Sequence, residues 1–286
     1  MEFYDFDQLY ISGKFAHRKA VASIGVFDGL HLGHQHIIRQ AVSEAKSRNG
    51  SDVVVFTFAQ NPKMMLKRTQ FNLPLLSLRL SSTLYESLGV DKVVVIDFSP
   101  DFSKLTGEEF IAKCCELFDV KALVVGENFR CGQKADTDVN AIKSFLHRYT
   151  DSAELIVPKM YRLTDGTEDS STLIRTALMK GKMTEVSALL GRDYSLDLAH
   201  IPSRKNEWPL CVSIESFVQL LPPPGVYEAF LKMHSDRSFA VKCTLDDSRL
   251  SLAAADENGM EIAHLIRDGS YRYDSLEFVK ELHTTC

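Results

Sequence analysis

The sequence lacks the long apolar runs and the basic charge excess that mark several protein classes. No apolar run in the 286 residues approaches the length of a membrane-spanning helix. Residues 1–5 lack the basic start and apolar core of a secretory signal peptide. The net charge is −5, whereas broad nucleic-acid binding usually requires a basic surface. We therefore expect a soluble, cytoplasmic protein that binds neither membranes nor nucleic acids.

Metal-binding and disulfide patterns are also missing. None of the six cysteines forms a CxxC pair and no HExxH occurs, so the recurring ligand spacing of a zinc site is absent. The adjacent Cys114 and Cys115, without a disulfide-like framework, fit free thiols in a reducing compartment. No acidic pair identifies the ligands of a divalent cation either, so the ligands of any metal stay unassigned.

The most informative feature present is an apolar strand followed by a glycine turn and a helix. Residues 21–26 have the small and β-branched apolar character of a buried strand, and Asp28 with Gly29 forms a strong turn dipeptide. The apolar residues that follow repeat at helical intervals. Because the first turn of a helix carries free N–H groups and a partial positive charge, its start favours a phosphate.

Two histidines lie at the start of this predicted helix. His31 and His34 are three residues apart, so they share one helix face, and Gly33 between them lets a phosphate approach the backbone. The pattern indicates a site that holds an anion rather than attacks one. By itself, a His-x-x-His pair is more often a helix cap or a solvent-facing pair.

The first part of the chain alternates strand and helix signals. We predict strands over residues 21–26, 53–58, 93–96, 122–125 and 154–157, and helices over 34–47, 81–88, 106–118 and 139–147. Alternation of this kind predicts an α/β fold with a Rossmann-like, doubly wound parallel sheet. Ligands of such sheets bind beyond the carboxyl ends of the strands, where residues 27–34, 59–62 and 126–130 emerge.

After Arg192 the character changes to short apolar segments punctuated by proline. We predict a small antiparallel β-barrel with strands over 210–214, 226–231, 239–244 and 249–253, closed by a C-terminal helix over 273–282. The predicted domains are therefore residues 1–190 and residues 191–286.

These motifs resemble those of the nucleotidylyltransferase superfamily and, within it, of the bacterial FAD synthetases (bifunctional riboflavin kinase/FMN adenylyltransferases). The long form of the first motif, Gly-Val-Phe-Asp-Gly followed by His-x-Gly-His, carries the resemblance. Further matches follow in the family's order over residues 54–62, 88–96, 125–130, 170–175 and 190–192. The resemblance covers about the first two thirds of the chain.

The resemblance implies transfer of AMP from ATP to FMN, which gives FAD and pyrophosphate in FAD biosynthesis. ATP and FMN are then the substrates, and Mg²⁺ is expected because ATP phosphates usually carry it. It implies that His31 and His34 bind phosphates and stabilise transition-state charge, and that Arg175 supports the departing pyrophosphate. Ten further residues are expected to hold the nucleotide or the flavin: Gly25, Phe27, Asp28, Gly29, Gly33, Asn61, Asn128, Ser170, Ser171 and Thr172.

Two of these motifs have plainer explanations when taken alone. Residues 170–175 are also consistent with an ordinary Ser/Thr helix cap and a surface arginine, and Asn128 with a loop amide that bonds its own backbone. Two departures concern the flavin side: relatives often have Pro-His-Pro at residues 60–62, and phenylalanine at Cys131. A different acceptor of AMP, or a flavin- or nucleotide-binding protein without catalysis, therefore stays as the alternative.

In the family the second domain is a riboflavin kinase, with a Gly-x-Pro-Thr-x-Asn stretch for ATP and a glutamate base. The corresponding stretch here is residues 207–212, in which Leu210 and Val212 replace the hydroxyl and the amide that hold Mg·ATP. Ser251 stands where the glutamate is expected, and a serine hydroxyl is a poor proton acceptor without an activating neighbour. We expect a kinase-like barrel that has lost the kinase reaction.

Overall fold

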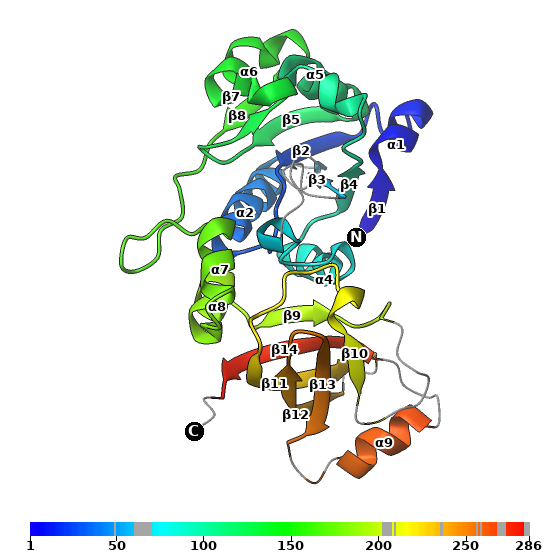
Figure 1. Ribbon diagram of the computed structural model, residues 1–286. Coiled ribbons are helices and arrows are strands. Elements are labelled where there is room, and N and C mark those ends of the chain that lie inside the picture. Colours follow the sequence, from blue (N-terminus) through cyan, green and yellow to red (C-terminus); the bar gives the residue numbers. More distant parts are fainter. Residues whose placement is uncertain are drawn as a thin grey trace. The chain divides into compact units, whose positions relative to one another are not determined.

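The computed structural model forms two compact units (Figure 1). The first contains Met1–Arg68 and Ser81–Asp169, and the second contains Thr69–Leu80 and Ser170–Cys286. The residues that the structure describes are 1–48, 50–59, 70–150, 152–201, 208, 210–234, 237–255, 257, 259–267 and 273–282. The division at residue 190 stays a prediction, because compactness does not show which segment folds by itself.

The first unit is built on a parallel sheet in the order β1-β4-β3-β2-β5-β8. Its strands are β1 (Glu2–Asp5), β2 (Lys19–Ile24), β3 (Asp52–Phe58), β4 (Lys92–Ile96), β5 (Asp119–Val124) and β8 (Glu154–Ile156). The predicted doubly wound parallel sheet is thus confirmed, with β1 as an added edge strand. Because the chain winds outward in both directions from β2 and β5, the topological switch point lies between these two strands, where such folds bind ligands.

Helices and a hairpin complete the first unit. They are α1 (Phe6–Ser12), α2 (Leu32–Ser47), α4 (Leu78–Leu88, whose first residues belong to the second unit), α5 (Gly107–Leu117), α6 (Val139–Phe145), β6 (Arg130–Cys131) and β7 (Thr137–Asp138). Short 3₁₀ helices are η1 (Gln70–Asn72), η2 (Phe102–Lys104), η3 (Gln133–Ala135), η4 (Leu146–Arg148) and η5 (Ile214–Ser216), of which η1 and η5 lie in the second unit. A capping box of Thr106 and Glu109 starts α5, as its sequence spacing predicts.

An aromatic core fixes the sheet of the first unit in place. Phe6 of α1, Phe56 of β3 and Phe110 of α5 are all at most 3% exposed. The ring of Phe6 meets Phe56 edge-on with centroids 6.4 Å apart, and Phe110 at 6.3 Å. Burying each such side chain contributes about 1.5–3 kcal/mol to stability. This rigid platform holds the carboxyl ends of the central strands, from which the loops of the candidate site emerge.

The second unit is an antiparallel sheet in the order β10-β13-β12-β11-β14-β9. Its elements are β9 (Tyr194–Asp197), β10 (Cys211–Ser213), β11 (Gly225–Met233), β12 (Ser238–Leu245), β13 (Arg249–Ala254), β14 (Tyr273–Glu281), α7 (Ser171–Leu178), α8 (Met183–Leu190) and α9 (Gly259–Arg267). The predicted second, antiparallel architecture is confirmed. In the part of the chain that the structure describes, no helix has the length and apolar character of a transmembrane segment.

The predicted C-terminal helix is wrong, because this segment is the strand β14, which pairs with β11 and β9. Leu276, Val279 and Leu282 are spaced three residues apart, which resembles the apolar stripe of a helix. The buried side chains follow a different rule, since Leu276 and Phe278, two apart, are both fully buried. A period of two places both on one face of a strand.

Candidate functional site

The loop between β2 and α2 is held in a conformation that few residues adopt. Phe27 and Leu30 have φ of 48° and 41°, in the left-handed region. Such backbone costs on the order of 1–3 kcal/mol per residue and persists only where the surroundings determine it. Both side chains are buried, and a Cβ on Gly25 would lie 2.9 Å from the Phe27 ring. The glycine therefore makes room for a ring that the loop turns inward.

The carboxylate of Asp169 lies at the start of α2, a contact that the sequence pattern did not reveal. His31 is the N-cap residue but its side chain makes no capping bond. Instead the Oδ2 atom of Asp169 accepts from the backbone N–H of Gly33 at 2.7 Å and lies 2.8 Å from Nδ1 of His31. In this structure the backbone N–H of Gly33 is therefore occupied by the carboxylate of Asp169. A Cβ at Gly33 would lie 3.1 Å from the His31 ring, so any larger residue here would press on that ring.

The two predicted histidines lie against each other. Their ring centroids are 3.7 Å apart, and the edge of Phe27 meets His34 at 5.4 Å. Burial, with a smaller contribution from His31, lowers the pKa of His34 well below its usual value. Because the folded protein disfavours the charged ring, His34 is neutral at neutral pH. The Nδ1 atom of His34 is enclosed and has no hydrogen-bond partner among the described residues.

The loop after β5 packs beside the same helix. Gly126 lies close to α2, since a Cβ at this position would be 3.1 Å from Cδ1 of Ile37. A turn closed by the bond from Phe129 N–H to the carbonyl of Gly126, 3.0 Å long, leaves Asn128 exposed. These contacts bring Asn128 to the edge of the sheet that carries the histidines. Asn61 lies outside the described residues.

Cys131 lies in β6 and packs against the core of the first unit. Burial raises the pKa of its thiol to about 12, so the group is protonated and apolar in character at neutral pH. The side chain that replaces the expected phenylalanine is therefore a small packing residue.

The second phosphate motif begins α7 within the second unit. Ser170 is the N-cap, and its Oγ accepts from the N–H of Leu173 at 3.3 Å. Arg175 is 4% exposed, so the alternative of a surface arginine is wrong. Its Nη1 atom donates to the carbonyls of Phe71 and Leu73. The guanidinium thus anchors the 71–73 segment in addition to any part that it takes in catalysis.

Taken together, the structure gathers part of the predicted set at the carboxyl edge of the parallel sheet. The members in the first unit are Gly25, Phe27, Asp28, Gly29, His31, Gly33, His34 and Asn128. The motif members in the second unit are Ser170, Ser171, Thr172 and Arg175. Asp169 was missed because it precedes the motif by one residue, and only its distant partners, His31 and Gly33, identify it.

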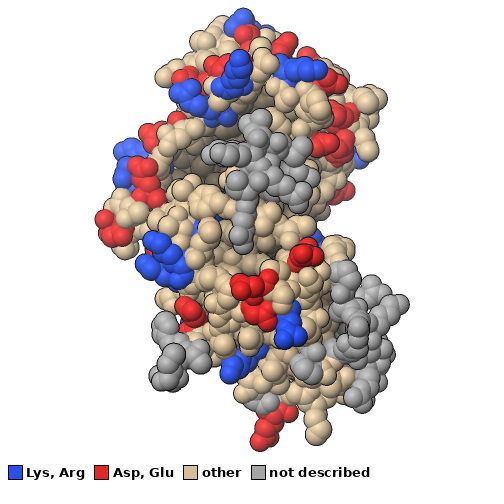
Figure 2. Space-filling model, in the orientation of Figure 1, with Lys and Arg blue, Asp and Glu red and all other residues tan. Residues whose placement is uncertain are grey.

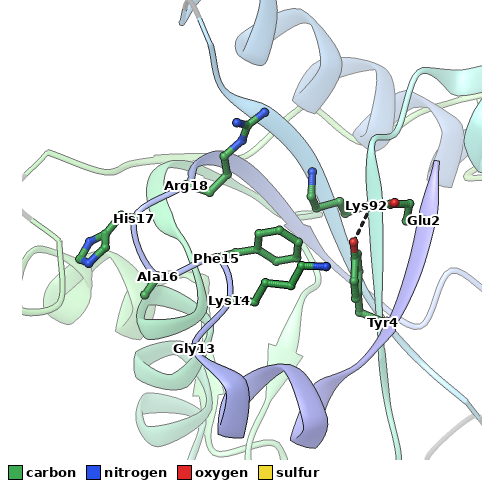
Figure 3. A pocket seen from close by; sticks show the side chains of 9 residues that line it. All are labelled: Glu2, Tyr4, Gly13, Lys14, Phe15, Ala16, His17, Arg18 and Lys92. Carbon is green, nitrogen blue, oxygen red and sulfur yellow. Dashed lines mark hydrogen bonds between the residues drawn. The ribbon is translucent and has the colours of Figure 1, made fainter.

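A hollow of about 530 Å³ lies at the opposite edge of the sheet (Figure 3). Its lining includes Glu2 and Lys92, which begin β1 and β4, and the turn before β2. Lys92 binds Asp52 at 2.6 Å, and Lys14 lies 5.0 Å from the ring centroid of Phe15. Because Lys92 and Lys14 already have partners within the protein, they give little support for an anion-binding site in this hollow. Lys and Arg on the face drawn in Figure 2 are likewise interspersed with acidic side chains.

Comparisons with known proteins identify the family of this chain. The model of the FAD synthetase family matches residues 14–172, more than half of the chain. An FAD synthetase of Listeria monocytogenes is 30% identical over 62% of this chain and 70% of its own length. A bifunctional riboflavin kinase/FMN adenylyltransferase of Buchnera aphidicola is 28% identical over 79% of this chain and 73% of its own length.

A solved structure shows the same fold. A macrolide-efflux protein from Streptococcus pneumoniae superposes with a TM-score of 0.71 and covers 94% of this chain and 86% of its own, at 21% identity. At that identity the likeness concerns the fold alone. The family match and the relatives carry the assignment: this chain belongs to the FAD synthetase family of nucleotidyltransferases.

Proposed function

We propose that this chain transfers AMP from ATP to FMN. An oxygen of the FMN phosphate forms a bond to the α-phosphorus of ATP, the bond from that phosphorus to the β-phosphate oxygen breaks, and pyrophosphate leaves. The observation that carries the proposal is the His31–His34 pair at the start of α2, beside the switch point of the sheet. Membership of the FAD synthetase family supports the same reaction.

The chain's own part in this reaction is to bind and orient the substrates. Nucleotidyl transfer needs little covalent chemistry from the protein and depends on positioning and charge stabilisation. His34 is neutral, and its Nδ1 is enclosed, so Nε2 is the ring nitrogen that is left to bind a phosphate oxygen. His31 directs its Nδ1–H to Asp169, so its Nε2 donates to a phosphate oxygen when the ring carries a proton on both nitrogens.

The second motif, in this proposal, also binds phosphate. A single peptide bond joins Asp169, which holds the start of α2, to Ser170, which caps α7. The N–H groups at the start of α7 favour phosphate, and Arg175 adds a permanent positive charge. Among the described residues no three His, Cys, Asp or Glu side chains gather as metal ligands. The ligands of any Mg²⁺ that accompanies ATP therefore stay unassigned.

We further propose that the second unit does not phosphorylate riboflavin. Leu210 and Val212, at the expected ATP stretch, are each 3% exposed and pack as core residues. Ser251, at the expected position of the base, directs its hydroxyl to Sγ of Cys211 at 3.6 Å and gains no acidic partner from that contact. Glu207 and Pro209 of the same stretch lie outside the described residues.

Incubation of the full chain with ATP, Mg²⁺ and either FMN or riboflavin tests both proposals. Chromatography is expected to show FAD from FMN, and neither FMN nor FAD from riboflavin. Failure to form FAD from FMN contradicts the transferase, and turnover of riboflavin contradicts the loss of the kinase.

A further inference from the structure

We propose that Asp169 is a positioning residue that holds the ring of His31 in place and keeps a proton on its Nδ1 atom. This inference rests on the proposed function, because it assigns to His31 the task of donating an Nε2–H to a phosphate, for which the ring carries a proton on each nitrogen. The side chain of Asp169 is 0% exposed and that of His31 is 5% exposed, so their contact is shielded from water. In such surroundings the hydrogen bond is strong and its partners have few alternatives.

The geometry places a proton on the Nδ1 atom of His31. Oδ2 of Asp169 receives the N–H of Gly33 at 2.7 Å and lies 2.8 Å from Nδ1 of His31. An ionised carboxylate only accepts hydrogen bonds, so Nδ1 is the donor. The two nitrogens of an imidazole ring point in different directions, and Nε2 therefore points away from the carboxylate. A carboxylate that orients a functional histidine through its second nitrogen is a common supporting arrangement in active sites.

The contacts exceed what a helix cap requires. A cap needs only the bond to Gly33, whereas Asp169 also holds the His31 ring, which in turn lies 3.7 Å from the His34 ring. The remaining oxygen, Oδ1, has no partner among the described residues. The carboxylate therefore serves a neighbour as well as the helix.

A competing explanation is that the carboxylate occupies the place of a phosphate and has to be displaced. It predicts a different kinetic result, because removal of the carboxylate then tightens ATP binding without a loss of turnover. Positioning predicts that turnover falls while the affinity for ATP changes little.

Nitrogen NMR of the full chain, labelled in its histidines, tests the inference without any enzyme assay. In the wild type at neutral pH, Nδ1 of His31 is expected to carry a proton. In D169A the neutral ring is expected to shift toward the Nε2–H form. D169N retains an oxygen acceptor and is expected to restore the wild-type tautomer. The matched control is D165N, four residues earlier on an exposed turn.

Kinetics supply the second test. D169A is expected to lower kcat for FAD formation at least about tenfold, the range seen when a supporting partner is removed, with the KM for ATP within about twofold. In an H31Q background, D169A is expected to lower kcat no further, because Asp169 acts through His31.

Three results overturn the inference: an unprotonated Nδ1 of His31 in the wild type, an equal kcat loss in the H31Q background, or a lower KM with unchanged kcat in D169A. The wild-type spectrum decides even if D169A fails to fold. A wild type that forms no FAD contradicts only the proposed function, because the spectrum still reports the contact between Asp169 and His31.

Discussion

Replacement of His34 by alanine separates catalysis from stability more cleanly than any other change in the site. The ring loses its contacts with His31 and Phe27, and aromatic contacts of this kind contribute about 0.5–1.5 kcal/mol each. The change also removes Nδ1, an enclosed atom without a partner among the described residues, and burial of such an atom costs about 1–3 kcal/mol. Alanine is the best helix former, by up to about 0.7 kcal/mol. These opposing contributions leave the free energy of unfolding within about 1 kcal/mol of the wild type.

Turnover is expected to respond very differently. Loss of one preorganised donor to a developing charge typically lowers kcat by about 10² to 10³, equivalent to about 2.7–4 kcal/mol. The assay is FAD formation by chromatography, with thermal unfolding measured on the same samples. H36A is the matched control, because His36 lies on the same helix and its ring is 6.0 Å from Tyr161. If H34A retains more than about a tenth of the wild-type kcat, the phosphate-binding role of the pair is refuted.

Three further predictions concern stability and packing. R175A removes a buried guanidinium that holds backbone carbonyls of the 71–73 segment, and urea unfolding is expected to show a loss of about 2–4 kcal/mol. G33A places a methyl group 3.1 Å from the His31 ring, so FAD assays are expected to show a lower kcat with little change in melting temperature. Below pH of about 6.5 the unfolded chain binds a proton that His34 in the folded state does not. Stability is therefore expected to fall as pH falls, by up to about 1.4 kcal/mol per pH unit, and H34A is expected to lack this contribution.

The sequence predicted the parts of the site that depend on short-range order. The apolar strand, the Asp28 turn and the helix with His31 and His34 lie in one continuous segment, and their local preferences agree with the parallel sheet. Helix starts were predictable for the same reason. Thr106 and Ser170 cap their helices, as expected of short polar side chains at that position.

The parts that depend on distant contacts were not predictable in the same way. Asp169 reaches the start of α2 from 136 residues away, and no local pattern records that bond. The burial of Arg175 depends on carbonyls about a hundred residues earlier, so a local reading favoured a surface position. Apolar residues near Leu276 fit a helix and a strand almost equally, and pairing with β11 decided between them.

Labelled ATP tests the central claim most directly. The full chain is supplied with FMN and with ATP labelled at the α-phosphorus, and the products are separated and counted. We expect the label in FAD, with one pyrophosphate released for each FAD formed. Label that stays in ADP or AMP while no labelled FAD forms would contradict the account.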